Sequence, residues 1–192
     1  MNVNRIQLFP TLIYDVECPE LIDDVLEELD KATWENDWYN RNDNVFTLKN
    51  NKKLIKKIED IVNETLSEIE YTVPLKMSTS WFTRIPPGDL GRNHYHTNSF
   101  YSAIFYPQDN NSRLVVAKEL PQINVPFKTT DMGLVAAGDV GLEARKGHMI
   151  LIPGNIRHYI EQNITNKNRH SLAMNFMPKG FCETDDSSYN YK

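Results

Sequence analysis

Two segments in the first third of the chain repeat apolar residues every three or four positions. The first, within residues 19–37, carries Leu21, Ile22, Val25, Leu26 and Leu29, with acidic residues between them. The second begins near residue 51 and carries Leu54, Ile55, Ile58, Ile61, Val62 and Leu66. This spacing places apolar side chains on one side of an α-helix. The pattern therefore predicts two amphipathic helices that pack against a sheet.

The pattern changes near Tyr71 to short runs of β-branched and aromatic residues, which turn sequences such as IPPGDLG, AAGDVG and IPGN separate. Such runs predict short strands. A further strand is expected in the opening segment IQLFPTLIYDVEC, with a break at Pro10. Helices followed by many short strands predict an α+β fold, in which the N-terminal helices brace an antiparallel sandwich or barrel.

A chain of 192 residues has the length of one domain. We expect a single domain over 1–192, with a strand and helical support in 1–70, a β core in 71–181 and a polar, frayed tail in 182–192. Apolar residues make up 40% of the chain and charged residues 24%, a balance typical of a folded protein.

The net charge of −5 argues against sequence-independent nucleic-acid binding, which requires many cations against phosphate. No apolar run is long enough to cross a bilayer, so a cytoplasmic protein without a membrane partner is expected. Cys18 and Cys182 predict two unpaired thiols. Trp34, Trp38 and Tyr39 either form the patch of a homodimer or pack the first helix against the sheet, and we prefer the second interpretation.

Two of the five histidines, His94 and His96, lie one residue apart in RNHYHTNSFYSAIFYP. On a strand, residues i and i+2 share a face, and imidazole is a good ligand for Fe, Zn, Cu and Ni. The alternative is two polar residues at the edge of a strand. In KGHMILIPGNIRHYI, a strand, a tight turn and a second strand would bring His158 back over the sheet as a third ligand. His148 is expected to be exposed at the start of a strand.

The strand NRHSLAMNF places Arg169 and Ser171 on one face and His170 on the other. The planar guanidinium of an arginine matches a carboxylate with two parallel hydrogen bonds, and a serine hydroxyl adds a third. The pattern predicts a carboxylate site near the histidines. The alternative interpretation is an exposed arginine on an edge strand.

These motifs follow one another over most of the chain in a recognisable order, from LFPTLIY through SWFTRIPPGDLGRNHYHTNSFYSAIFYP and KGHMILIPGNIRHYI to RHSLAMNF. In that order they resemble the iron(II) and 2-oxoglutarate-dependent oxygenases, and more narrowly a branch common in marine bacteria and their phages. The resemblance implies a double-stranded β-helix, also called a jelly roll or cupin-like fold. A phage-encoded member would work in the host cytoplasm.

The resemblance also implies roles for six residues. Fe(II) would be held by His94, His96 and His158, and the far carboxylate of 2-oxoglutarate by Arg169 and Ser171, with Tyr106 as a further contact or a plain core aromatic. His96 stands where most of the superfamily has Asp or Glu, which raises the charge of the metal site by one unit. A second alignment would make His96 the first ligand and Asn98 the acidic position, but an amide oxygen is a weaker ligand than imidazole for such metals.

The implied activity is that of a dioxygenase, which couples decarboxylation of 2-oxoglutarate to hydroxylation of a small-molecule or peptidyl substrate. Two alternatives remain. One is a three-histidine metal dioxygenase that does not use 2-oxoglutarate, and the other is a catalytically degenerate jelly roll that only binds. The segment 121–147 is expected to line the mouth of the pocket, because specificity in β scaffolds resides in loops.

Overall fold

The computed structural model describes residues 11–34, 46–69, 73–117, 139–183 and 186–191. Its helices are α1 (Ile22–Asp30) and α2 (Lys52–Thr65), with short 3-10 turns at Pro19–Leu21 and Leu66–Ile69. Its strands are β1 (Tyr14–Glu17), β2 (Leu75–Ile85), β3 (Tyr101–Phe105), β4 (Leu114–Val116), β5 (Val140–Leu142), β6 (His148–Pro153), β7 (His158–Ile160), β8 (Arg169–Pro178), β9 (Gly180–Glu183) and β10 (Ser188–Tyr191).

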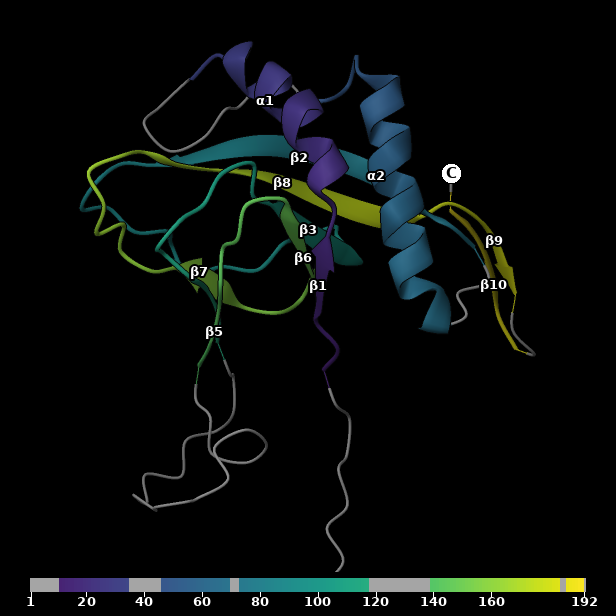
Figure 1. Ribbon diagram of the computed structural model, residues 1–192. Coiled ribbons are helices and arrows are strands. Elements are labelled where there is room, and N and C mark those ends of the chain that lie inside the picture. Colours follow the sequence, from purple (N-terminus) through teal and green to yellow (C-terminus); the bar gives the residue numbers. More distant parts are fainter. Residues whose placement is uncertain (1–10, 35–45, 70–72, 118–138, 184–185, 192) are drawn as a thin grey trace, which may run out of the picture.

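Two antiparallel sheets form the body of the molecule (Figure 1). The larger sheet has the strand order β1-β6-β3-β8-β2, and the smaller one has the order β5-β4-β7. Apolar side chains from both sheets, including Ile104, Ile150, Ile152 and Leu114, pack together in the space between them. The predicted α+β sandwich, with strands after helices, is confirmed.

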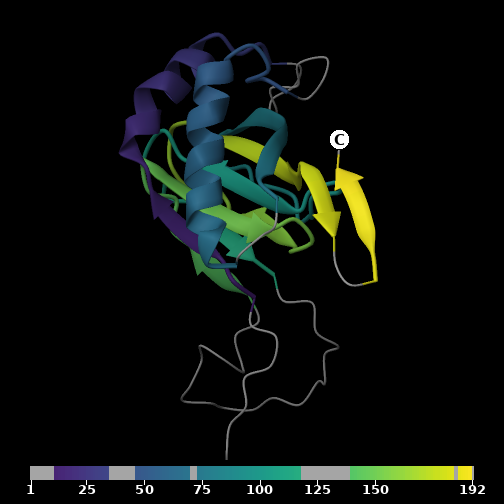
Figure 2. The ribbon, with the colours of Figure 1, turned by 90° about the vertical axis from the view of Figure 1, so that its right-hand side faces the viewer.

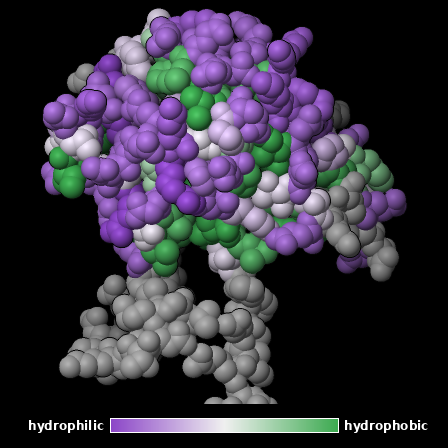
Figure 3. All heavy atoms as spheres, viewed as in Figure 1, coloured by the Kyte–Doolittle hydropathy of each residue, from purple (hydrophilic) through white to green (hydrophobic). Residues whose placement is uncertain are grey.

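Both helices cover the outer face of the larger sheet (Figures 1 and 2). Their apolar stripes join the sheet in the largest buried cluster, which includes Val25, Ile58 and Phe105. The helix α2 begins where predicted, because the side chain of Asn51 accepts a hydrogen bond from the Leu54 backbone N–H at 3.0 Å. The surface that the helices turn outward is mostly hydrophilic (Figure 3). Within the described residues, neither helix is long and apolar enough to span a bilayer.

The strand β8 lies between β3 and β2, and its side chains alternate between two different interiors. Leu172, Met174 and Phe176 belong to the cluster beneath the helices. The other set faces the space between the sheets and comprises Arg169, Ser171, Ala173 and Asn175, all buried. This second face of β8 carries polar residues into the interior, and the functional site is built on it.

The C-terminal segment differs from the prediction. Residues 182–192 were expected to form a frayed tail, but β9 and β10 pair as an antiparallel hairpin in which Tyr189 lies opposite Cys182. The hairpin extends away from the sandwich (Figure 2). Tyr189 and Tyr191 share one face of β10, and their ring centroids are 4.7 Å apart.

Several predicted features lie outside the described residues, namely Pro10, Trp38, Tyr39 and most of the segment 121–147. Trp34 is described, and it packs against the cluster beneath the helices, as the preferred interpretation predicted. Within the part of the chain that the structure describes, neither Cys18 nor Cys182 forms a disulfide bond.

Candidate metal centre

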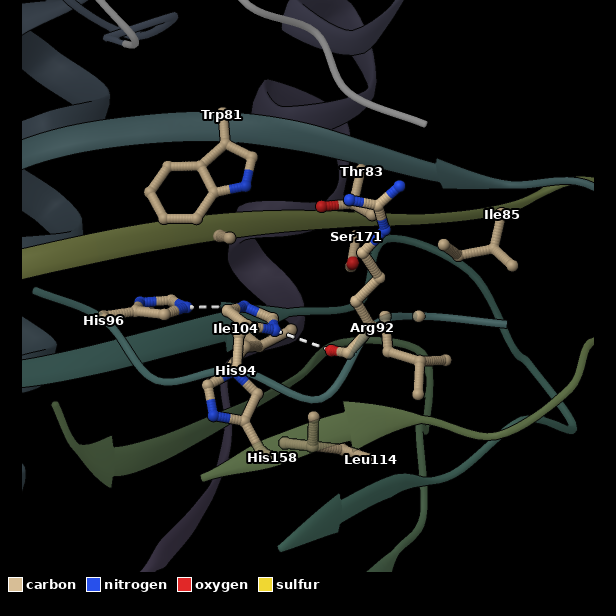
Figure 4. A pocket seen from close by; sticks show the side chains of 13 residues that line it. Trp81, Thr83, Ile85, Arg92, His94, His96, Ile104, Leu114, His158 and Ser171 are labelled. Carbon is tan, nitrogen blue, oxygen red and sulfur yellow. Dashed lines mark hydrogen bonds between the residues drawn. The ribbon is translucent and has the colours of Figure 1, made fainter. Parts of the chain in front are cut away.

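Three histidines from two parts of the chain converge between the sheets (Figure 4). His94 and His96 lie on the segment between β2 and β3, and His158 is the first residue of β7. One ring nitrogen of each lies within 4.8 Å of those of the other two. The Nε2 atoms of His94 and His96 are 3.3 Å apart. The structure thus brings together the three histidines that the sequence singled out.

The local backbone around the pair differs from the prediction, because His94 and His96 do not lie on a strand. They are held instead by backbone hydrogen bonds to the turn region after β6. The N–H of His94 donates to the carbonyl of His158 at 3.0 Å, and the N–H of His158 donates back at 2.8 Å. The N–H of His96 donates to the carbonyl of Gly154 at 2.9 Å. These bonds, rather than the pleat of a strand, orient both imidazoles toward the same point.

Hydrogen bonds on the far side of two rings define which nitrogen is free. The Nδ1 of His94 lies 2.7 Å from the carbonyl oxygen of Arg92, and the Nδ1 of His158 lies 3.0 Å from that of Ile156. A carbonyl oxygen can only accept, so both Nδ1 atoms carry the proton and both Nε2 atoms present a lone pair. Nε2 lone pairs directed at a common point suit a cation.

The protonation state of the site also suits a metal. Burial, reinforced by the neighbouring histidines, lowers the pKa of His96 to about 4 and that of His158 to about 3. Both rings are therefore neutral at pH 7, and neutral imidazole is the form that binds a metal ion. In the described part of the chain, these three residues are the only cluster of three or more His, Cys, Asp or Glu side chains with the spacing of a metal site.

Asn98, the acidic position in the second alignment, lies apart from the three histidines. It is exposed and adopts a positive φ of 54° in the turn before β3. A short polar side chain suits this conformation. The geometry favours the first alignment, in which His96 itself occupies the carboxylate position.

Arg169 is fully buried on the same inner face, which excludes the interpretation as an exposed residue on an edge strand. Its Nη1 donates to the hydroxyl of Ser171 at 3.2 Å, and its Cζ lies 5.1 Å from the centre of the Tyr106 ring. Among the described residues, Nε and Nη2 of Arg169 and the hydroxyl of Tyr106 have no hydrogen-bond partner. Burial lowers the pKa of Arg169 and raises the pKa of Tyr106.

An unpaired buried guanidinium is costly, because the charge has lost its water without gaining a counter-ion. The donor set here consists of Nε and Nη2 of Arg169, with the hydroxyls of Ser171 and Tyr106 beside them. That set fits a carboxylate.

A pocket with a cavity volume of about 40 Å³, or about 470 Å³ when the space open to solvent is included, is lined by the three histidines and by Ser171 (Figure 4). Its walls are largely apolar and are formed by Trp81, Ile85, Ile104, Leu114, Ile160 and Ala173. Thr83 and Ser171, which lie opposite each other on β2 and β8, add hydroxyls. The Trp81 ring lies 5.3 Å from that of His96. Trp81 and Thr83 were not predicted as site residues, although both precede the turn IPPGDLG at alternate positions of a segment rich in strand-forming residues.

The two remaining histidines lie elsewhere. His148 begins β6, as predicted, but it is partly buried rather than exposed, and its Nδ1 lies 2.9 Å from a carboxylate oxygen of Asp15. His170 faces away from Arg169, as predicted, and its ring lies 5.9 Å from that of Trp34.

Two facing sheets thus enclose three convergent imidazoles, which could hold a metal ion, and a buried guanidinium, which could receive an anion. The match to known families specifies the class of protein. Residues 79–175, half of the chain, match the sequence model of the family described as "Putative 2OG-Fe(II) oxygenase". The chain belongs to this family of 2-oxoglutarate and Fe(II)-dependent oxygenases, so it is an enzyme whose cofactors are Fe(II) and 2-oxoglutarate. No curated protein sequence matches the chain significantly.

Solved structures similar to this chain share the jelly-roll fold at low sequence identity. The epimerase SnoN from nogalamycin biosynthesis superposes with a TM-score of 0.60 at 12% identity, over 88% of this chain and 80% of its own. HygX from Streptomyces hygroscopicus, solved with nickel, 2-oxoglutarate and hygromycin B, gives 0.59 at 12% identity, over 88% and 83%. A Pseudomonas putida prolyl-4-hydroxylase gives 0.55 at 11% identity, over 88% and 94%. The expected double-stranded β-helix is confirmed.

Proposed function

We propose that the chain is a dioxygenase that hydroxylates a small-molecule or peptidyl substrate, with Fe(II) held by the Nε2 atoms of His94, His96 and His158. Arg169 would bind the far carboxylate of 2-oxoglutarate, with Ser171 and Tyr106 at its sides. One observation carries this assignment. The buried guanidinium of Arg169 has two nitrogens, Nε and Nη2, without partners among the described residues, and it faces the same interior as the three imidazoles.

When bound, Fe(II) and 2-oxoglutarate would allow O2 to serve as the oxidant: 2-oxoglutarate would lose carbon dioxide and take up one oxygen atom as succinate, and the other oxygen atom would enter the C–H bond of the substrate as its hydroxyl group. The protein's own residues supply position and a dry site. Arg169 fixes the cosubstrate at its far end, and two parallel hydrogen bonds would set its direction as well as its place. Ile104, Leu114 and Ile160 line the pocket and exclude water from the space between the two ends of the site.

The substrate class is supported by the pocket and by the similar structures. The described wall of the pocket contains no carboxylate, and Trp81 offers a flat apolar surface beside His96. HygX was solved with hygromycin B and SnoN with nogalamycin RO, both small molecules, and the prolyl-4-hydroxylase bears the name of a reaction on a prolyl residue. These neighbours support both halves of the proposed class.

Calorimetry under anaerobic conditions tests the cosubstrate site directly. We expect 2-oxoglutarate to bind the Mn(II)-loaded protein and Arg169→Ala to reduce the affinity by about 100-fold or more, because each charge-assisted hydrogen bond contributes about 1.5–3 kcal/mol. Arg113→Met is the matched control, since Arg113 is paired with Glu161 at the surface and its loss also removes one positive charge. Unchanged affinity in Arg169→Ala, or equal losses in both variants, would contradict the proposal.

The hydroxylation itself requires a separate assay. Succinate release measured against a metabolite library and a protein extract should reveal turnover that depends on one substrate class. If succinate is released at the same rate with and without an added compound, the protein is not a hydroxylase with a specific substrate.

A further inference from the structure

A small polar network lies behind His96, on the side of the ring away from the other two histidines. The Nδ1 of His96 is 2.6 Å from Oδ1 of Asn175 and 2.7 Å from the hydroxyl of Ser102. The Ser102 hydroxyl donates to the same Oδ1 at 3.0 Å. All three side chains are buried, with exposed fractions of 8% or less. Asn175 and Ser102 lie opposite each other on β8 and β3, so the two central strands of the sheet hold the network rigidly.

His96 therefore differs from the other two histidines in how its ring is fixed. The rings of His94 and His158 are each fixed by the backbone carbonyl two residues earlier in the chain. The ring of His96 is fixed by side chains, 79 residues away in the case of Asn175. A side-chain amide can present either of its two ends, an acceptor or a donor.

The two ends of the Asn175 amide have opposite consequences for metal binding. With the oxygen toward His96, the ring proton resides on Nδ1 and Nε2 is a free lone pair. With the NH₂ group toward His96, Nδ1 would have to accept, and the proton would move to Nε2. That proton would then point at Nε2 of His94, 3.3 Å away, and a hydrogen bond between the two rings would occupy the position of the metal.

We propose that Asn175 is a positioning residue of the metal centre. Its amide oxygen, supported by Ser102, holds the Nδ1 proton of His96 and thereby presents a bare Nε2 to Fe(II). This inference rests on the proposed function, in which His96 is a ligand. The partner of His96 is a neutral amide, so neither the ligand nor its support brings a negative charge, and the network acts by orientation and proton placement alone.

The arrangement predicts opposite effects for two substitutions of similar size. Asn175→Leu removes the acceptor and should weaken Ni(II) binding by about 10- to 100-fold, the usual effect of losing such a supporting contact. Asn175→Asp keeps an acceptor at the same place and adds a negative charge behind the ring. It should bind Ni(II) at least as tightly as the unmodified protein. Ser102→Ala should show a smaller loss than Asn175→Leu, because Oδ1 of Asn175 remains.

The measurement is the Ni(II) dissociation constant, obtained by competition with a metallochromic chelator, together with the visible absorption spectrum of the Co(II)-loaded protein. Neither readout needs substrate or turnover. Ser112→Ala is the matched control, because Ser112 is a buried serine whose hydroxyl bonds the carbonyl of Gln162 rather than a histidine. Its affinity and spectrum should be unchanged. Circular dichroism establishes that each variant is folded, and Asn175→Asp and Ser102→Ala keep the test decisive if Asn175→Leu does not fold.

The outcomes separate the inference from the proposed function. If the unmodified protein binds Ni(II) but folded Asn175→Leu binds it equally well with the same Co(II) spectrum, the inference is overturned and the metal site stands. If Asn175→Asp loses as much affinity as Asn175→Leu, an acceptor behind the His96 ring does not support metal binding and the inference is again overturned. If the unmodified protein binds neither Ni(II) nor Co(II), the proposed metal centre fails, and the role of Asn175 falls with it.

Discussion

Replacing Arg169 with methionine should stabilise the protein in the absence of cofactors and remove its response to 2-oxoglutarate. Arg169 is fully buried, and its Nε and Nη2 have no partner among the described residues. Two interactions offset the cost of burying the charge. They are the hydrogen bond to Ser171, worth about 1.5–3 kcal/mol for a charged donor, and the contact with the Tyr106 ring, worth roughly 2 kcal/mol when desolvated.

The desolvation penalty of a buried ion is several kcal/mol, and replacing buried ionic groups with apolar residues of similar size is neutral or stabilising by about 1–4 kcal/mol. In a domain of this length, 1 kcal/mol shifts the unfolding temperature by about 2–4 °C. We therefore expect Arg169→Met to unfold between about 0 and 16 °C above the unmodified protein when both lack metal and 2-oxoglutarate. The sign of the change in unfolding temperature is the informative part, because replacing an arginine with a purely structural role would lower that temperature.

Thermal unfolding with and without 2-oxoglutarate, each in the presence of Ni(II), provides the second half of the assay. A ligand at about 100 times its dissociation constant stabilises the folded state by about 2.7 kcal/mol. The unmodified protein should show this shift, and Arg169→Met should not. Arg113→Met should have the same unfolding temperature as the unmodified protein without 2-oxoglutarate, and the same increase when 2-oxoglutarate is added. A cofactor-free Arg169→Met that unfolds well below the unmodified protein, or that still responds to 2-oxoglutarate, would refute the reasoning.

Three further predictions concern pH, a turn and a helix cap. The pKa of His158 is lowered to about 3, so below the ordinary value of about 6.5 the unfolded state binds more protons than the folded state. The metal-free protein should therefore lose unfolding free energy, measured by urea denaturation, as the pH falls from about 6.5 to about 3. His158→Phe should lose less unfolding free energy over the same pH range. In Gly154→Ala the new Cβ would clash with the carbonyl oxygen of Ser99, so we expect this variant to lose about 1–3 kcal/mol of unfolding free energy or more in the same assay. Gly141→Ala is the control and should be tolerated, because its Cβ would meet only a flexible arginine side chain. Asn51→Ala should cost about 1 kcal/mol of unfolding free energy through the lost cap of α2, and an unchanged midpoint would contradict that role.

The sequence predicted the residues whose type and spacing carry their chemistry. The pair His94 and His96, the distal His158 and the alternation of Arg169 with Ser171 are visible because each pattern is local or contains a rare residue type. The residues that contact them could not be predicted from the sequence in the same way. Asn175 contacts His96 only because β8 and β3 pair in one register, and a shift by one residue would move it to the other face. Register depends on the whole sheet, so no local pattern indicated this contact.

The misjudged segments have related physical causes. The pair of histidines was expected on a strand because it precedes an aromatic run, but the turn at Asn98 separates it from β3. The C-terminal hairpin was missed because its polar composition was taken as a sign of fraying, although β9 begins only two residues after β8 ends. In the histidine segment, hydrogen bonds to His158 and Gly154, far away in the sequence, decide a conformation that local propensity leaves open.

The reciprocal backbone bonds between His94 and His158 have a consequence for the motions of the protein. This bridge is an isolated pair outside any longer ladder, and it joins the segment before β3 to the first residue of β7. A metal ion bound to the side chains of His94 and His158 would be a second link between the same two segments. Loss of the ion should then make local opening around His94 and His158 more frequent, without an effect on the sheet that the helices cover. The amide protons of these two residues would exchange with solvent faster in the metal-free protein, while those of β8 would stay protected.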